Sequence, residues 1–184
     1  MSYPSWSYFP RNARPEPWAE ALCAAVGAQR TALDTLQPLP TGATRPSSDG
    51  VLEVLRPSME RLGYLVEAGK TRSQRIERPV LFGENGRAEV TYEIDAFHDG
   101  LGIAVEVEAG RGAMSNAAYR DIIRTSLLLD ADYFVLMMPI SYRYQSAGRT
   151  STTDAYAKTR EQLSAIYASQ RLRLPFRAVL LIGY

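Results

Sequence analysis

The sequence contains very little cysteine and histidine, and this scarcity excludes several kinds of site. Cys23 is the only cysteine and His98 the only histidine among 184 residues. A single cysteine rules out an internal disulfide and a zinc cluster built on thiolates. We find no Ser-His-Asp set, phosphate-binding glycine loop or thiol nucleophile. Any catalytic chemistry must therefore come from other side chains.

Long hydrophobic runs and an excess of charge of one sign are also missing. No stretch approaches the ~18 apolar residues of a membrane span, and residues 1–18 lack the basic start and apolar centre of an export signal. We therefore expect a cytoplasmic protein that does not enter the membrane. Lysine and arginine number 21 against 20 aspartates and glutamates, a net charge of +1, so an affinity for polyanions would have to be local.

The chain does have the length and composition of one soluble domain. With 46% hydrophobic and 22% charged residues, it can bury a core without a disulfide or a structural metal. Segment 37–49 is rich in Pro, Ser, Thr and Gly, which predicts a connector. We predict a single domain over 1–184, with an N-terminal helical extension and connector at 1–47 and the main body at 48–184.

The N-terminal extension combines aromatic residues with a predicted helix. Trp6, Tyr8 and Phe9 precede a stretch with helical periodicity at 18–36. We interpret the aromatic side chains as a hydrophobic cap on the main core. A platform on which nucleic-acid bases stack is the alternative.

Periodicity in the main body predicts alternating helices and strands. Helices are expected at 48–63, from 115 or 116 to 129, and at 152–170; strands are expected at 64–67, 89–97, 101–108, 133–139 and 176–182; a basic link occupies 70–78. The order α-β-β-β-α-β-α-β predicts an α/β fold with a mixed β-sheet flanked by helices. Asp99-Gly100, between the second and third strands, is typical of a hairpin turn.

The predicted hairpin places carboxylates on one face. Side chains alternate along a strand, so Glu106 and Glu108 share a face, and a turn of even length puts Glu93 and Asp95 on the same face. With Asp99-Gly100 as the central pair, Glu93 is opposite Glu106 and Asp95 is diagonal to it.

Carboxylates crowded in this way repel each other. Protonation, a basic partner or a hard divalent cation relieves the repulsion, and Arg87 is the only lysine or arginine between Glu84 and Glu108. We therefore favour a metal site. A solvated acidic surface is the alternative.

The segments YEIDAF (92–97) and VEVE (105–108), on two strands between helices, resemble the PD-(D/E)XK phosphodiesterase superfamily, also called restriction endonuclease-like. The resemblance covers 48–140 and implies a restriction endonuclease-like core. It also implies that Asp95, Glu106 and the Val107 carbonyl bind Mg²⁺ (or Mn²⁺), and that the ion activates a water molecule.

Glu108 occupies the position where the superfamily usually has lysine. This is similar to the E-X-E variant of BamHI- and BglII-type restriction enzymes, and it implies that Glu108 orients the water or accepts its proton. In the superfamily the first helix sometimes supplies another acid, which here would be Glu53 or Glu60. The alternative is that Glu53 and Glu60 are ordinary acidic residues on the exposed surface of the helix.

Basic and amide side chains near the motif are candidates for binding nucleic acid. Arg111 follows the acidic strand, and Asn116, Arg120 and Arg124 recur every four residues on the next helix. Structural pairing with Asp121 or Asp130 is the alternative for these arginines. The link 70–78 suits a loop that follows phosphates, and a solvated link is its alternative. Its basic residues are Lys70, Arg72, Arg75 and Arg78.

Together these features predict a Mg²⁺-dependent nuclease that hydrolyses phosphodiester bonds, with the catalytic residues Asp95, Glu106 and Glu108. We expect a DNA endonuclease in restriction, repair or defence, and a homodimer if both strands are cut. A catalytically inactive nucleic-acid-binding or assembly module is the alternative, because Glu108 cannot act as a cationic stabiliser. Hydrolysis of RNA or of a small phosphodiester is a third reading, since a fold does not determine its substrate.

Overall fold

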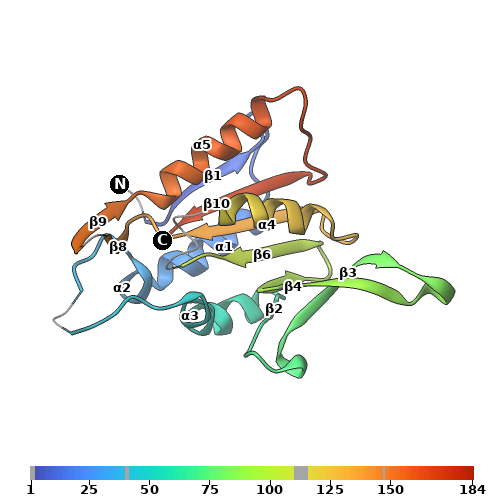
Figure 1. Cartoon of the computed structure of the whole chain (residues 1–184), viewed down its shortest axis with the longest axis horizontal. Coiled ribbons are helices and arrows are strands. Elements are labelled where there is room, and N and C mark those ends of the chain that lie inside the picture. Colours follow the sequence, from blue (N-terminus) through green and yellow to red (C-terminus); the bar gives the residue numbers. More distant parts are fainter. Residues whose placement is uncertain (1–2, 40–41, 110–115, 147) are drawn as a thin grey trace.

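The computed structural model describes residues 3–39, 42–109, 116–146 and 148–184 (Figure 1). Within these ranges, no helix is both long enough and apolar enough to cross a membrane. In chain order the elements are β1 (Ser5–Phe9), α1 (Pro17–Ala28), α2 (Arg30–Leu33), α3 (Ser48–Arg61), β2 (Leu65–Val66), the 3-10 turn η1 (Arg72–Gln74), β3 (Ile76–Phe82), the 3-10 turn η2 (Glu84–Gly86), β4 (Ala88–Ile94), β5 (Ala96–His98), β6 (Ile103–Val107), α4 (Ala117–Ser126), β7 (Tyr133–Met138), β8 (Tyr142–Ser146), β9 (Arg149–Thr153), α5 (Ala155–Ala168) and β10 (Ala178–Gly183).

The centre of the fold is a mixed β-sheet with the strand order β1-β10-β7-β6-β5-β2. Strands β6, β7 and β10 are parallel, whereas β1, β5 and β2 join by antiparallel pairing. The parallel strands read IAVEV, YFVLMM and AVLLIG and are almost entirely buried, as expected for parallel strands covered by helices. The predicted α/β fold with a mixed sheet flanked by helices is confirmed.

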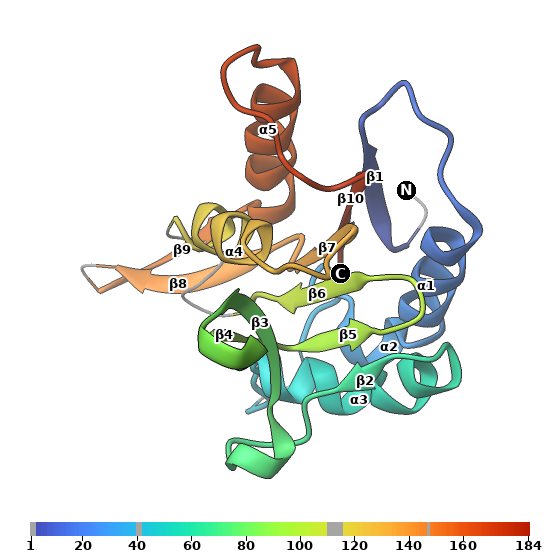
Figure 2. The ribbon, with the colours of Figure 1, turned by 90° about the vertical axis from the view of Figure 1, so that its right-hand side faces the viewer.

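Helices cover both faces of this sheet (Figure 2). On one face Val105 and Val107 belong to the same core cluster as Leu55 of α3. On the other face Ala104 clusters with Ile122 of α4. Because neither face of the central strands meets solvent, polar groups on these strands can gather only near the strand ends.

The N-terminal extension contributes a strand that its sequence did not predict. β1 lies antiparallel to β10 as an edge strand of the sheet, and Tyr8 and Phe9 are buried in the two core clusters. The cap interpretation is confirmed for these two residues, while Trp6 is exposed. A five-residue strand has little periodicity to detect, and it forms here because the edge of β10 supplies its hydrogen-bonding partners.

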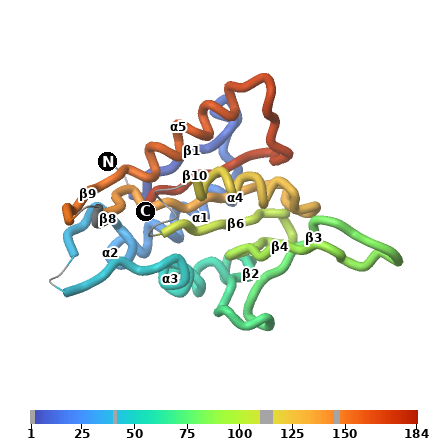
Figure 3. The backbone as a smooth tube through the Cα atoms, viewed as in Figure 1, coloured from blue at the N-terminus to red at the C-terminus, as the bar shows by residue number. Residues whose placement is uncertain are grey.

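Two antiparallel hairpins outside the central sheet were also not predicted. The predicted strand 89–97 is divided at Asp95 into β4 and β5, and β4 pairs with β3 in a separate ribbon that extends away from the main body (Figures 1 and 3). β8 pairs with β9, so the helix predicted from 152 begins at Ala155 instead. Both ribbons are largely exposed and therefore lack the buried apolar face that makes a strand recognisable.

Candidate active site

The hairpin between β5 and β6 has the predicted parity but a different register. Ala96 is opposite Val105, and His98 is opposite Ile103, so the turn consists of the four residues 99–102 instead of Asp99-Gly100 alone. An even turn keeps the carboxylates on one side, as predicted. The longer turn shifts the pairing by two residues, and the continued register puts Asp95, not Glu93, opposite Glu106.

An acidic cavity of about 280 Å³ lies at the carboxyl end of β6. It is bordered by the start of α3, the loop after β2, the junction of β4 and β5, and α4. Its lining residues are Ser48, Asp49, Glu67, Lys70, Glu93, Ile94, Asp95, Glu106, Val107, Glu108, Arg120 and Arg124. The structure thus brings together the predicted catalytic residues at the strand ends, where α/β proteins commonly bind ligands.

Asp95 is fixed between two strands. Its Oδ2 accepts a hydrogen bond of 2.7 Å from the Val107 N–H, and its own carbonyl accepts one of 2.8 Å from the Glu67 N–H. Burial raises the pKa of Asp95 to about 6; the Val107 hydrogen bond opposes this rise, and repulsion from Glu67 adds to it. The carboxylate is therefore held in place in an environment that disfavours its charge.

Glu106 is a second carboxylate with a raised pKa. Burial raises its pKa well above the ordinary value, and the charges of Asp95 and Asp121 raise it further. Arg124 acts in the opposite direction but does not compensate. Two neighbouring carboxylates with raised pKa values indicate a site where negative charge exceeds its compensation.

Glu108 contacts α4. Its Oε1 accepts a hydrogen bond of 2.6 Å from Arg120, whose Nε also donates to Asp121 at 2.9 Å. The pKa of Glu108 is raised to about 8, first by burial and then by its hydrogen bond with Asp121 and the negative charge of Asp121. The buried Asp121 Oδ2 has no hydrogen-bonding partner among the described residues. The structural pairing considered for Arg120 is therefore present.

The donor set fits a magnesium site with few protein ligands. In the described parts of the chain, no three Asp, Glu, His or Cys side chains converge closely enough to hold a metal by themselves. Mg²⁺ commonly takes one or two carboxylates and fills its remaining positions with water and phosphate oxygens. Asp95 and Glu106 offer such hard oxygen donors.

Another carboxylate in the cavity, Glu67, was not singled out from the sequence. Its side chain is only 7% exposed, although it directly follows β2. The sequence placed it at the end of the predicted strand 64–67 and gave no further sign of a role. It enters the cavity because β2 pairs with β5 next to Asp95.

The other predicted site residues differ in their surroundings. Glu53 is exposed on α3 and lines a neighbouring cavity of about 300 Å³, which shares Asp49 and Glu67 with the acidic cavity. Asn116 is the residue before α4. Arg124 lies over the Tyr92 ring, 5.3 Å from its centroid. Arg111 lies outside the described residues.

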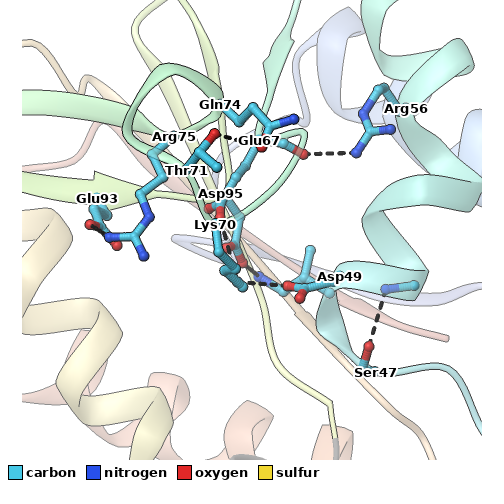
Figure 4. A network of polar contacts seen from close by, with 12 residues as sticks. Ser47, Asp49, Arg56, Glu67, Lys70, Thr71, Gln74, Arg75, Glu93 and Asp95 are labelled. Carbon is cyan, nitrogen blue, oxygen red and sulfur yellow. Dashed lines mark hydrogen bonds and ion pairs between the residues drawn. The ribbon is translucent and has the colours of Figure 1, made fainter.

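The basic link 70–78 separates into residues with different contacts. The Lys70 Nζ lies 2.8 Å from Asp49 and 3.4 Å from Glu67, inside the acidic cavity (Figure 4). Arg75 forms an ion pair with Glu93, which Figure 4 also shows. Arg72 begins η1 and is exposed.

Arg78 contributes to packing. Its guanidinium lies 3.7 Å from the centroid of the Phe97 ring. It also forms ion pairs with Asp99 and Asp130. Structural contacts therefore occupy Arg78.

Comparison with known proteins identifies the family of the chain. No curated protein matches the chain. A family profile matches residues 2–184, nearly the full length, and its description is "Putative halobacteria restriction endonuclease". The match supports the restriction endonuclease-like part of the resemblance, and the E-X-E relation to BamHI- and BglII-type enzymes stays a hypothesis. The fold and the family profile agree, and the chain belongs to this restriction endonuclease family.

Proposed function

We propose that this protein is a Mg²⁺-dependent endonuclease that hydrolyses phosphodiester bonds in DNA. The observation behind the proposal is the pair Asp95 and Glu106, two neighbouring carboxylates with raised pKa values in one cavity at a strand end. The family description, which names a restriction endonuclease, supports the same class of reaction.

In this proposal Asp95 and Glu106 would hold Mg²⁺ or Mn²⁺ together with the Val107 carbonyl. The Val107 N–H fixes the Asp95 carboxylate before any ligand arrives, which reduces the cost of ordering it. A bound ion of this type polarises the phosphate and lowers the pKa of a coordinated water. Glu108 positions Arg120 at the cavity wall through their 2.6 Å contact.

Basic side chains beside the carboxylates support DNA as the substrate. Arg120, Arg124 and Lys70 line it beside the carboxylates, and such cations neutralise phosphates of a bound strand. Cleavage of both strands of a duplex needs two such sites, so we propose a homodimer on DNA. Sedimentation of the protein with a DNA duplex measures this stoichiometry.

A catalytically inactive nucleic-acid-binding or assembly module is the second candidate. It is favoured by Glu108 at the usual lysine position and by the lack of a three-ligand cluster in the described residues. Such a module keeps the fold and the basic contacts but lacks hydrolysis.

Incubation of the protein with plasmid DNA or structured RNA, in Mg²⁺, Mn²⁺ or EDTA, separates these candidates. We expect metal-dependent cleavage of DNA that EDTA abolishes. Glu106→Gln should lower the rate by about 10²-fold or more, because even residues that only support a metal ligand contribute about 10–100-fold. Glu161→Gln, on the exposed surface of α5, is the matched control and should cleave normally. DNA binding without cleavage in every metal would establish the inactive module.

A further inference from the structure

Three cationic side chains line the acidic cavity, and their contacts differ. Arg120 lies between Glu108 and Asp121 and contacts both. Arg124 lies over an aromatic ring and donates to a backbone carbonyl at 3.3 Å. Lys70 is the cation on the opposite wall, on the side of α3 and the loop after β2.

The loop that contains Lys70 is attached directly to the strand junction at Asp95. β2 pairs with β5, and the Glu67 N–H donates to the Asp95 carbonyl at 2.8 Å. From the next residue the chain turns back: the Ala68 N–H donates to the Gln74 carbonyl at 3.0 Å, and Lys70 lies within this turn. Lys70 is consequently near enough to Asp95 for its charge to lower the pKa of that carboxyl.

The ammonium of Lys70 lies between the buried Glu67 and a second carboxylate, Asp49, that substrate can replace. The side chain of Asp49, in the first turn of α3, is 61% exposed and that of Lys70 is 63% exposed; Figure 4 shows the contact between them. Exposed ion pairs of this kind contribute little to stability. Lysine has three N–H donors on a flexible side chain, so a phosphate oxygen can take the place of the Asp49 carboxylate.

We propose that Lys70 is a catalytic residue of this centre and that its ammonium contacts a non-bridging oxygen of the phosphate being cleaved. This inference rests on the proposed nuclease function and adds a residue to it. The chain would thus provide from the loop after β2 the positive charge that Glu108 cannot provide from β6. Arg120 is less suited to this role because both carboxylates that hold it, Glu108 and Asp121, are buried, whereas Asp49 beside Lys70 is exposed.

The positive charge of Lys70 is needed while the phosphodiester bond is being cleaved. The water oxygen forms a bond to phosphorus, the bond from phosphorus to the leaving oxygen breaks, and negative charge is distributed over the phosphoryl oxygens. One proton of the water passes to solvent, and the leaving oxygen takes one from solvent. Lys70 stays protonated throughout and stabilises the developing charge through its N–H donors.

Chemical labelling tests the contact without relying on cleavage, because Lys70 and Lys158 are the only lysines in the chain. Lys158 is exposed on α5, away from the cavity residues. The protein is treated briefly with an amine-reactive reagent, with and without duplex DNA, and each lysine is quantified by mass spectrometry. We expect DNA to slow the labelling of Lys70 by about fivefold or more and to leave Lys158 unchanged. Equal labelling rates at Lys70 with and without DNA would overturn the contact.

Kinetics of variants test the catalytic role. Lys70→Met should lower kcat by about 10²–10³-fold, the usual effect of losing one donor to a developing oxyanion, with a smaller change in KM. Lys70→Arg should recover part of the rate, and Lys158→Met should match the wild type.

Metal binding distinguishes a catalytic Lys70 from one that only maintains the structure of the site. The rise in melting temperature caused by Mn²⁺ should be the same in Lys70→Met and in the wild type, because Lys70 is not a ligand. A Lys70→Met protein that cleaves as fast as the wild type refutes the assignment, and so does one that no longer responds to Mn²⁺. If the wild type itself cleaves no nucleic acid, the proposed function fails, and the labelling result decides the DNA contact separately.

Discussion

Neutralising Asp95 should have opposite effects on the metal-free and the metal-bound protein. In Asp95→Asn the side chain keeps an oxygen that accepts the 2.7 Å hydrogen bond from the Val107 N–H. It loses a charge that burial and the neighbouring Glu67 disfavour. The variant should therefore be more stable than the wild type in EDTA at neutral pH.

The size of this gain follows from the pKa of Asp95. The pKa rises from 3.8 to about 6 on folding, and one pKa unit corresponds to about 1.4 kcal/mol. The upper bound is about 3 kcal/mol, and with the mutated side chain still packed we expect about 2 kcal/mol. For a protein of this length, that is roughly 4–8 °C in melting temperature.

The gain must also depend on pH with a definite sign. A group whose pKa is raised on folding binds its proton more tightly in the folded state, so ionisation costs stability as pH rises. Below about pH 3.8 both states are protonated and the cost is absent; it grows as pH rises through about 6. The difference between Asp95→Asn and the wild type should therefore be small at pH 4 and full at pH 7.5.

Metal should reverse the order of stability. An ion that binds only the folded protein stabilises it by about 2.7 kcal/mol at a hundredfold excess over Kd, and Asp95→Asn lacks one ligand for it. Melting curves in EDTA and in millimolar Mg²⁺ or Mn²⁺, with Glu161→Gln as the surface control, measure both effects. Equal metal responses in the two proteins would remove Asp95 from the metal site. A variant that is less stable in both conditions would show that Asp95 acts as a buried hydrogen-bonding partner.

Two further predictions concern the basic link. Replacing both Lys70 and Arg72 should flatten the slope of log K against log salt concentration for DNA binding by about two. Replacing Arg75, which is ion-paired, should change that slope by less than about one. Equal slopes for the wild type, the double variant and the Arg75 variant would mean that the link is a solvated loop. Arg78→Met should lower the free energy of unfolding in urea by about 1–2 kcal/mol, because its contact with the Phe97 ring and two ion pairs are lost. Arg87→Met, at an exposed position, is the control, and identical urea midpoints for the two variants would contradict the packing role.

The strongly apolar strands and the chemical type of the site could be predicted from the sequence. YFVLMM and AVLLIG are recognisable as buried strands because every side chain in them is apolar. The shared face of Glu106 and Glu108 follows from the two-residue period of a strand, which is a local property. The same period, with an even turn, also placed Asp95 on their side.

The pairing of distant segments decided the rest. The register of the hairpin depends on a four-residue turn, which the Asp99-Gly100 pattern did not distinguish from a two-residue one. β1 and the β3–β4 ribbon form only where another strand offers its hydrogen bonds.

The residues around Asp95 show most clearly what the sequence predicts and what only the tertiary structure decides. Glu67 and Lys70 precede it by more than twenty residues, and nothing in their own segment predicts that they share a cavity with it. They reach the site because β2 pairs with β5, and that pairing depends on hydrogen bonds between segments far apart in the chain. Local periodicity determines which side chains a strand presents to each face, whereas the tertiary structure alone determines which charges come together there.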